Sequence, residues 1–326
     1  MMASTVDPHA PESPASSPMA AIDLGTNTIL MVVGRRIRDD LAQDDQVEIL
    51  DDAHVIARMG KGVDEHRRVQ PETIDRVCQF LRNYRIRAEA LGAQRVCAFG
   101  TSALRDAANQ AQVIEAAGQQ AGVDLVEVSG LDEARLTFQG AAFGLQVPSR
   151  YAVIDIGGGS TEVAVGTAVG QVDASQSVDV GAVRVTERFF SQLPPTPQQI
   201  AQAREMILAI LADLPVSARD VALVGVAGTV TTLGAIDTQA PTFDAASING
   251  HVLSLDAVRD IAGRLLSLPH EQIQSIPQIS DQRADIISAG ALILQLYMEL
   301  SGHEQLIVST RGIRYGLLLD MLAGRR

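Results

Sequence analysis

One short pattern occurs twice in the chain and constrains its fold more than any other feature. Residues 20–34 run from an apolar segment through Asp23 and Gly25 into a second apolar segment, and residues 151–166 repeat this order around Asp155. Two apolar runs separated by a glycine turn predict two strands joined tightly. Because strands and helices alternate around both copies, we predict an α/β protein with two similar domains and a cleft between them.

Helical periodicity supports the same plan between and after the two copies. Apolar residues recur at helical spacing over residues 71–91, and we expect a single further helix over residues 103–121. A third helix, almost entirely apolar, is predicted over residues 285–300. Residues 1–19 are rich in Pro, Ser and Ala, which is typical of a disordered tail.

Both glycine turns have the composition of an anion-binding loop. Glycine lets backbone N–H groups approach phosphate oxygens, hydroxyl groups add donors, and an aspartate can hold a metal directly or through water. The predicted phosphate-binding residues of the two turns are Asp23, Gly25, Thr26, Asn27, Thr28, Gly157, Gly158, Gly159, Ser160 and Thr161. The alternative for the first turn is a plain hairpin. The second turn fits that alternative poorly, because three consecutive glycines are costly to order.

A third glycine-hydroxyl element follows the apolar segment at residues 221–227. Gly228 and Thr229 come where a strand is expected to enter a helix, and a helix N-terminus can bind an anion. A simple helix cap is the alternative. None of the three elements is a Walker loop or a dinucleotide-binding fingerprint.

The charge and apolar distribution exclude several classes of protein. A formal net charge of −13 argues against non-specific nucleic-acid binding, and the apolar runs are too short for a membrane span. The two cysteines are expected to be buried thiols, which suits a reducing cytoplasm. Residues 58–105 carry ten basic and five acidic side chains, a local balance of +5. Part of this stretch, with Arg283 and Arg314, is a candidate entry path for a polyanion; a solvated helix face is the alternative.

The chain as a whole resembles a known family. The segments that carry the resemblance, in order, are AIDLGTNT, RMGKGVD, GTSALRDAAN, SGLDEARL, DIGGGSTE, VDVGAVRVTE, VAGTVTTL, QRADIISAGA and STRGIRYGLL. They resemble the exopolyphosphatase/guanosine pentaphosphate phosphohydrolase family of the actin-like ATPase superfamily, in its short, two-domain type. The resemblance implies two actin-like (ribonuclease H-like) domains. We expect the first over residues 20–131, completed by residues 311–326, and the second over residues 132–310.

The resemblance also implies roles for individual residues. Glu133 matches the glutamate that orients or deprotonates the attacking water, and Arg105 matches the arginine that contacts the attacked phosphate. Asp155 and Glu162 match carboxylates that hold Mg²⁺ or another divalent cation such as Mn²⁺. Asp132 beside Glu133 leaves open which carboxylate acts, and a residue that caps a helix is the alternative for Glu133.

The activity implied by the resemblance is metal-dependent release of terminal phosphate from inorganic polyphosphate, with a preference for shorter chains. One alternative is a guanosine pentaphosphate (pppGpp) 5′-phosphohydrolase of the stringent response. Another is a non-catalytic sensor that binds ppGpp, pppGpp or ATP. We expect a cytoplasmic homodimer. One departure from the family pattern is Tyr315, at a position where glutamate is common.

Overall fold

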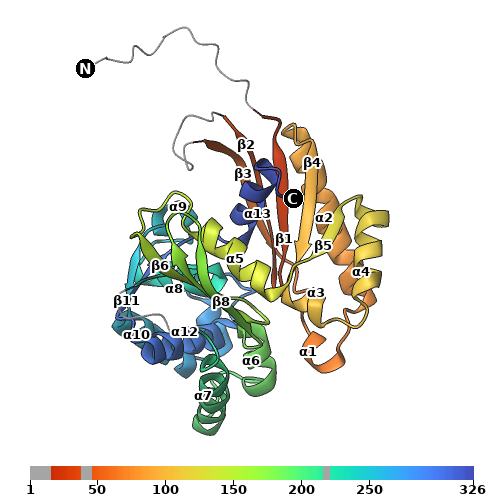
Figure 1. The fold of residues 1–326 in the computed structure, drawn as a ribbon. Helices are drawn as coiled ribbons and strands as arrows, with labels where there is room; N and C mark the ends of the chain where they lie inside the picture. Colours follow the sequence, from red (N-terminus) through yellow and green to blue (C-terminus); the bar gives the residue numbers. More distant parts are fainter. Residues whose placement is uncertain (1–15, 38–45, 216–220) are drawn as a thin grey trace, which may run out of the picture.

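The computed structural model describes residues 16–37, 46–215 and 221–326, which form two β-sheets covered by helices (Figure 1). In the first sheet the order is β3-β2-β1-β4-β5, and in the second it is β10-β11-β9-β6-β7-β8. The strands of the first sheet are β1 (Met19–Leu24), β2 (Thr28–Arg36), β3 (Val47–Ile56), β4 (Arg95–Gly100) and β5 (Asp124–Glu127). Those of the second are β6 (Arg150–Ile156), β7 (Thr161–Thr167), β8 (Val172–Val178), β9 (Ala222–Val226), β10 (Val252–Ser254) and β11 (Gln305–Val308).

The two sheets share one arrangement, as the repeat predicted. In each, three consecutive strands pair antiparallel, and the first of them, β1 or β6, also pairs parallel with a later strand, β4 or β9. A further parallel strand follows, β5 in one sheet and β11 in the other. The predicted α/β class with two actin-like sheets is therefore confirmed.

Helices connect the strands and lie on both faces of each sheet (Figure 1). The helices up to residue 189 are α1 (Val63–His66), α2 (Pro71–Ala90), α3 (Ser102–Asp106), α4 (Gln110–Ala116), the π-helical η1 (Ala117–Ala121), α5 (Gly130–Ala141) and α6 (Ala182–Phe189). Those that follow are α7 (Pro197–Leu211), α8 (Ala227–Asp237), α9 (Ala245–Ile248), α10 (Leu255–Ser267), α11 (His270–Gln274), α12 (Ile287–Ser301) and α13 (Ile313–Leu322). Among these described helices, none has both the length and the apolar character that a membrane span requires.

The prediction of one helix over residues 103–121 is wrong. The chain leaves helical geometry at Ala107, so α3 is separate from α4, which continues directly into η1. The reason is tertiary: the side-chain amide of Asn109 accepts a hydrogen bond from the N–H of Val69 and donates one to its carbonyl, both at 2.9 Å. These two bonds fix the break in place. Of the tail predicted for residues 1–19, residues 1–15 lie outside the described part, and β1 already begins at Met19.

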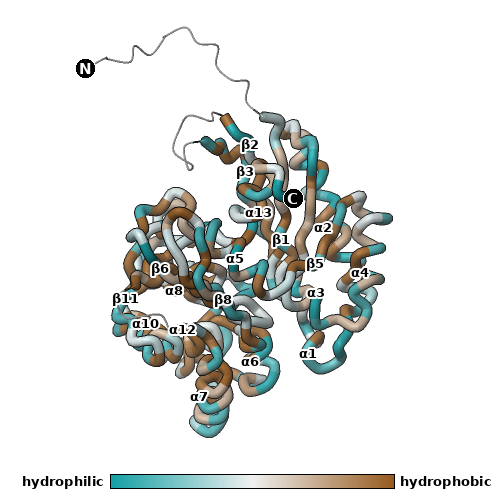
Figure 2. Tube along the Cα trace, in the orientation of Figure 1, coloured by the Kyte–Doolittle hydropathy of each residue, from teal (hydrophilic) through white to brown (hydrophobic). Residues whose placement is uncertain are grey.

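Each sheet has its own hydrophobic core, and the strand alternation decides which helices cover which face. On β1, Ile22 and Leu24 face the core that contains α2, whereas Ala21 faces the core that contains α13. Cys78 and Cys97 are both buried free thiols, as predicted. Figure 2 shows apolar segments along the strands of both sheets, whereas the short helix α1 is mainly hydrophilic.

Helices α5 and α13 meet between the two sheets (Figure 1). Helix α5 packs on β6, β7 and β8 of the second sheet, and α13 packs on β1 and β2 of the first. The two helices approach backbone to backbone, because a Cβ atom on Gly140 would overlap Gly312, and one on Gly316 would overlap Leu136. The contact between the halves of the molecule therefore depends on glycine at these positions.

Replacing Gly316 by alanine should destabilise the protein by about 1–3 kcal/mol, because the added methyl group would force the two backbones apart. The matched control is Gly263→Ala on the exposed face of α10, where nothing lies within 4 Å of the added Cβ. That control should be neutral or stabilising, by up to ~1 kcal/mol. Urea denaturation of both variants measures the difference, and equal stabilities would contradict this account of the crossing.

Candidate active site

A cavity of about 380 Å³ lies between the two sheets and is lined by residues from both. Its walls come from the β1–β2 turn, the β6–β7 turn, the first turn of α5 and the start of α8. Most of the predicted site residues line it: Asp23, Gly25, Thr26, Asn27, Thr28, Glu133, Asp155, Gly157, Gly158, Gly159, Ser160, Gly228 and Thr229. The structure thus brings three separate glycine-hydroxyl elements to one cavity.

Three predicted residues are not part of the cavity wall. Arg105 donates a hydrogen bond to Glu133 at 2.5 Å, and Glu162 accepts one from Ser177 at 2.6 Å. The hydroxyl group of Thr161 is fully buried and donates to the carbonyl oxygen of Val180 at 2.6 Å. Arg105 thus reaches the site through Glu133, whereas the hydroxyl that we predicted to contact phosphate at Thr161 is engaged with the backbone.

The two glycine turns have the same internal hydrogen bond. In the first, the N–H of Gly25 donates to the carbonyl of Thr28, and in the second the N–H of Gly157 donates to the carbonyl of Ser160, both at 3.0 Å. The aspartates that precede the turns, Asp23 and Asp155, occupy equivalent ends of β1 and β6. The repeated sequence pattern therefore corresponds to a repeated backbone geometry.

Carbonyl groups of the first turn are held from outside the cavity. Gly60 donates its N–H to the carbonyl of Thr26 at 2.8 Å, and Ala57 and Arg58 both donate to the carbonyl of Asn27 at 2.9 Å. Within the described residues, the N–H groups of Thr26 and Asn27 have no protein acceptor. These donors are therefore available to an anion in the cavity.

In the second turn, the first residues of α6 hold the carbonyl groups in the same way. The N–H groups of Ala182 and Val183 donate to the carbonyls of Gly157 and Gly158, at 2.9 and 2.8 Å. Within the part of the chain that the structure describes, the N–H groups of Gly158 and Gly159 have no protein acceptor. Two sets of free backbone donors therefore border one cavity, which is the arrangement that a chain of phosphates requires.

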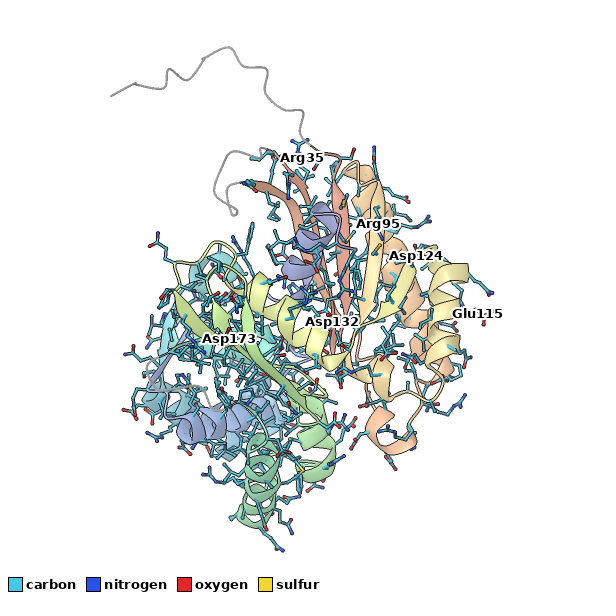
Figure 3. All side chains as sticks on the ribbon, in the orientation of Figure 1. Arg35, Arg95, Glu115, Asp124, Asp132 and Asp173 are labelled. Carbon is cyan, nitrogen blue, oxygen red and sulfur yellow. The ribbon has the colours of Figure 1, made fainter. Side chains whose placement is uncertain are left out.

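Glu133 lies in the first turn of α5 and points inward. The helix is capped by Ser129, whose hydroxyl oxygen accepts the N–H of Asp132 at 3.1 Å, so Glu133 is not the cap. The neighbouring Asp132 is half exposed on α5 (Figure 3) and forms long ion pairs with Arg135 and Arg326. Of the two adjacent carboxylates, only Glu133 lines the cavity.

Four carboxyl groups gather at or just behind this wall, and their surroundings favour the protonated form. Burial raises the pKa of Asp23, Glu133, Asp155 and Glu162 above the ordinary values, and the pKa of Asp155 reaches about 7. The charge of Glu133 raises the pKa of each of the other three as well. Arg105 opposes the shift at Glu133, but burial outweighs it. The cluster carries more negative charge than its neighbours neutralise.

This excess of negative charge is suited to binding a divalent cation. The Oδ1 atom of Asp23 is buried without a hydrogen-bond partner, and carboxylate oxygens are the ligands that Mg²⁺ prefers. Within the described residues, no three His, Cys, Asp or Glu side chains form a complete metal cage. Mg²⁺ commonly binds one or two carboxylates and takes its other ligands from water and substrate phosphate. Asp23 and Asp155, which line the cavity, are therefore suited to a cation shared with a phosphate ligand, and Glu162 lies behind them.

Only some of the positively charged side chains that the sequence analysis considered for the entry path line the cavity. Arg283 and Arg314 line the cavity, as expected of the entry path. None of the ten basic side chains of residues 58–105 lines the cavity wall itself. Several of them lie on or near α2, on the opposite face of the first sheet from α13, and they pair locally; Arg87, for example, contacts Asp51 at 2.5 Å. The solvated-face alternative is correct for α2.

The two cavity arginines differ in how they are neutralised. Arg314 forms two hydrogen bonds to Asp52, both at 2.9 Å. Arg283 donates to the carbonyl of Gly228 at 3.1 Å and to the hydroxyl of Thr232 at 2.9 Å, and no carboxylate of the described chain pairs with it. Burial lowers the pKa of Arg283 to about 10, so it stays charged at neutral pH. It is a positive charge available to an anionic ligand.

The sequence analysis missed His54 and Asp52. Both lie on β3 two residues apart, so they face the same side of the sheet and line the cavity. Burial, Arg283 and Arg314 together lower the pKa of His54, which keeps the imidazole neutral. The alternation of side chains along β3 indicates that these two residues share one face of the strand. Only the pairing of β3 with β2 shows that this face borders the cavity.

Two equivalent glycine turns with free N–H groups and a buried glutamate lie between two sheets of the actin-like type, an arrangement suited to binding phosphate groups. The chain belongs to the Ppx/GppA phosphatase family, whose pattern it matches over residues 38–324.

Individual relatives agree with this placement. Exopolyphosphatase 2 of Mycobacterium tuberculosis is 33% identical over 93% of this chain and 98% of the relative. The guanosine-5′-triphosphate,3′-diphosphate pyrophosphatase of Vibrio cholerae is 29% identical over 95% of this chain, but that match spans only 61% of the relative. Among solved structures, the Ppx/GppA family member of Aquifex aeolicus superimposes with a TM-score of 0.80 at 27% identity, covering 96% of this chain and 99% of that one. The predicted family is therefore confirmed.

Proposed function

We propose that this protein is an exopolyphosphatase, which hydrolyses the terminal phosphate of inorganic polyphosphate with a divalent cation. The observation that carries the proposal is the pair of turns with free N–H groups that line one cavity together with Glu133. A linear phosphate chain offers anionic oxygens along its whole length, so it can use both turns at once. The near full-length similarity to an exopolyphosphatase supports the same choice.

In the proposed reaction a water molecule attacks the terminal phosphorus, and its proton passes to the carboxylate of Glu133. The bond between that phosphorus and the bridging oxygen breaks, which releases orthophosphate and a chain shortened by one unit. Burial raises the pKa of Glu133, which makes its carboxylate a better proton acceptor than an exposed one. Arg105 holds this side chain in place through the 2.5 Å hydrogen bond.

The remaining groups bind and orient the substrate. The N–H groups of Thr26, Asn27, Gly158 and Gly159 donate to phosphate oxygens, where negative charge grows during the reaction. Asp23 and Asp155, with Glu162 behind them, would hold Mg²⁺ or Mn²⁺, and the bound cation would neutralise charge on adjacent phosphates. Without a bound cation, the four carboxyl groups of Asp23, Glu133, Asp155 and Glu162 would repel a polyanion.

Arg283 is proposed to bind a phosphate behind the terminal one. Arg283→Gln should raise KM for polyphosphate about tenfold or more while kcat changes less, because a charge-assisted hydrogen bond contributes about 1.5–3 kcal/mol. The control is Arg87→Gln, which removes an arginine that pairs with Asp51 outside the cavity. Steady-state phosphate release measures both variants. A similar KM in the two would remove Arg283 from the binding path.

A second candidate activity is hydrolysis of pppGpp at its 5′-terminal phosphate. The observation that favours it is an apolar part of the cavity wall, formed by Phe243, Ala245 and Ile286. A planar base could stack on the ring of Phe243, whereas inorganic polyphosphate has no group for this surface. The relative from Vibrio cholerae has this kind of substrate in its name.

Phosphate release by the purified protein with Mg²⁺ tests the proposal directly. Polyphosphates of several lengths, pppGpp and ATP serve as substrates, each at matched phosphate concentration. Fastest turnover on polyphosphate supports an exopolyphosphatase, and fastest turnover on pppGpp moves the protein to the second candidate activity. Tight binding of these compounds without release of phosphate from any of them would overturn both, and would favour a non-catalytic sensor.

A further inference from the structure

The two phosphate-binding turns differ in one contact. In the first turn, backbone N–H groups of Ala57 and Arg58 hold the carbonyl of Asn27. Its equivalent in the second turn is the carbonyl of Gly159, which accepts a hydrogen bond from Nε of Arg184 at 2.8 Å. In the second turn, therefore, a side chain donates the hydrogen bond that backbone N–H groups donate in the first turn. A side chain can be withdrawn more easily than the backbone segment that directly follows β3.

Arg184 also connects the two halves of the molecule. It is the third residue of α6, in the half that contains the second sheet, and only 6% of its surface is exposed. Its two terminal nitrogens donate to Asp106, at 2.5 Å, and to Asp64. These aspartates belong to α3 and α1, next to the first sheet. All three guanidinium nitrogens are therefore used, two toward one half and one toward the phosphate-binding turn of the other.

The partner Asp106 directly follows Arg105 in α3. Arg105 in turn contacts Glu133. Hydrogen bonds on either side of the adjacent residues Arg105 and Asp106 thus connect Glu133 to Arg184, which in turn bonds to Gly159. Because a guanidinium group is planar and rigid, its position relative to α3 fixes where the Gly159 carbonyl can lie.

We propose that Arg184 is a positioning residue that couples the geometry of the second phosphate-binding turn to the contact between the two halves; its effect on catalysis rests on the proposed function. With the halves together, Asp64 and Asp106 hold the guanidinium, which keeps the Gly159 carbonyl turned away from the cavity. The N–H of Ser160, on the other side of the same planar peptide group, is then directed toward the substrate. With the halves apart, that carbonyl loses its donor and the turn relaxes. Catalytic geometry is then complete only in the closed arrangement.

Helix α6 supplies a matched control for this proposal. Arg188, one turn further along, also bonds to Asp64, at 2.7 and 2.9 Å, but it contacts no carbonyl of the turn and is more exposed. Arg184→Gln and Arg188→Gln each remove one cation that contacts Asp64. Only the first removes the donor to Gly159.

Arg184→Gln should lower kcat about 100-fold, because a displacement of about 1 Å in a catalytic group can cost this much. KM should change far less, since the first turn and Arg283 still bind the phosphate chain. Arg184→Lys keeps the charge without the planar fork and should recover part of kcat. Arg188→Gln should keep kcat within about threefold of the wild type, as expected for an exposed ion pair. Equal kcat values for the two glutamine variants would overturn the proposal.

Hydrogen exchange at Gly157, Ala182 and Val183, whose N–H groups donate to carbonyls of the turn, provides a readout that does not depend on activity. These amides should exchange faster in Arg184→Gln than in the wild type, and their exchange should be unchanged in Arg188→Gln. If Arg184→Gln fails to fold, Asp106→Asn replaces it, because this variant releases the guanidinium from α3 and leaves Arg184 in place. Slow exchange in the folded Arg184 or Asp106 variant contradicts the proposal. Wild-type protein without phosphate release, combined with fast exchange in Arg184→Gln, would contradict the proposed function while leaving the role of Arg184 in holding the turn supported.

Discussion

Glu133→Gln is expected to lower kcat for phosphate release by about 10²–10⁴-fold, the contribution of a well-placed general base. Glutamine has nearly the same shape, so it can still fill the space beside Arg105, but it cannot accept a proton from water. Substrate binding should persist, because the N–H groups of both turns and Arg283 are untouched. KM should therefore change much less than kcat.

The neighbouring carboxylate gives the control for this prediction. Asp132→Asn makes the same chemical change one residue away, on a half-exposed side chain that does not line the cavity. Its kcat should stay within about twofold of the wild type, as is usual for an exposed ion pair. Substantial activity in Glu133→Gln, or a large loss in Asp132→Asn, would show that the wrong carboxylate has been assigned. Rapid-quench measurement of a single turnover distinguishes a slower chemical step from slower product release.

The pH–rate profile gives an additional test of the same residue. Burial raises the pKa of Glu133 above its ordinary value of 4.5. The base must be ionised to accept a proton, so kcat should fall at acidic pH with a midpoint above that value. Glu133→Gln should lose this acidic limb. A wild-type limb at or below the ordinary glutamate value would contradict a buried base.

How much of the site was predictable depends on whether its residues are close in sequence. The two turns were predicted because glycine, hydroxyl and carboxylate residues lie within eight positions, and both turns do line the cavity. Thr161 belongs to the same segment, yet its hydroxyl points to Val180. Composition identifies a loop, but the strand that follows decides which side chains face inward.

The residues that the sequence analysis missed are those brought in by pairing between distant segments. His54 lies opposite Leu30 in the β2–β3 pair, and this register places it on the cavity side. The same limitation explains the break at Asn109, whose partner Val69 is forty residues away. Helical periodicity is read from the spacing of apolar residues, so it gives no information about a polar contact between residues this far apart in the sequence.

Tyr315, the departure from the family pattern, lies behind the cavity rather than in its wall. Its hydroxyl donates to Asp52 at 2.7 Å, so Tyr315 and Arg314 hold the same carboxylate. Its ring packs near Phe143, with Arg311 and Arg314 over its face. A tyrosine here supplies a neutral donor to Asp52 where glutamate would place a second negative charge. The substitution is therefore accommodated by a local hydrogen bond.

Asp155→Asn is the variant expected to reveal the cation site. It should lower kcat by about 10²–10³-fold in saturating Mg²⁺, because a metal contributes several kcal/mol of charge stabilisation in reactions of this kind. The control is Asp256→Asn, which removes a highly exposed carboxylate on α10 that pairs with Arg259. That variant should keep wild-type activity. Unchanged activity in Asp155→Asn would exclude this carboxylate as a ligand that the reaction needs.

The stability of the metal-free protein tests the same site without activity. Burial and the charge of Glu133 raise the pKa of Asp155 from 3.8 to about 7. The folded protein therefore binds this proton more tightly than the unfolded chain, and the free energy of unfolding should fall as pH rises between those two values. A divalent cation must displace the proton, so Mg²⁺ should raise Tm more at about pH 8 than at about pH 5.

Asp155→Asn should reduce this pH dependence and remove most of the Mg²⁺ effect, because asparagine neither ionises nor binds the cation strongly. Part of the pH dependence should remain, since the pKa values of Asp23, Glu133 and Glu162 are raised as well. At about pH 8 and without metal the variant should be at least as stable as the wild type, since the wild type must bury a charge there. Thermal unfolding across this pH range, with and without Mg²⁺, measures all three effects. A Mg²⁺ stabilisation that is equal in the variant and the wild type would place the cation away from Asp155. A metal-free wild type that gains stability as pH rises would mean that these carboxylates are ionised and compensated by other groups.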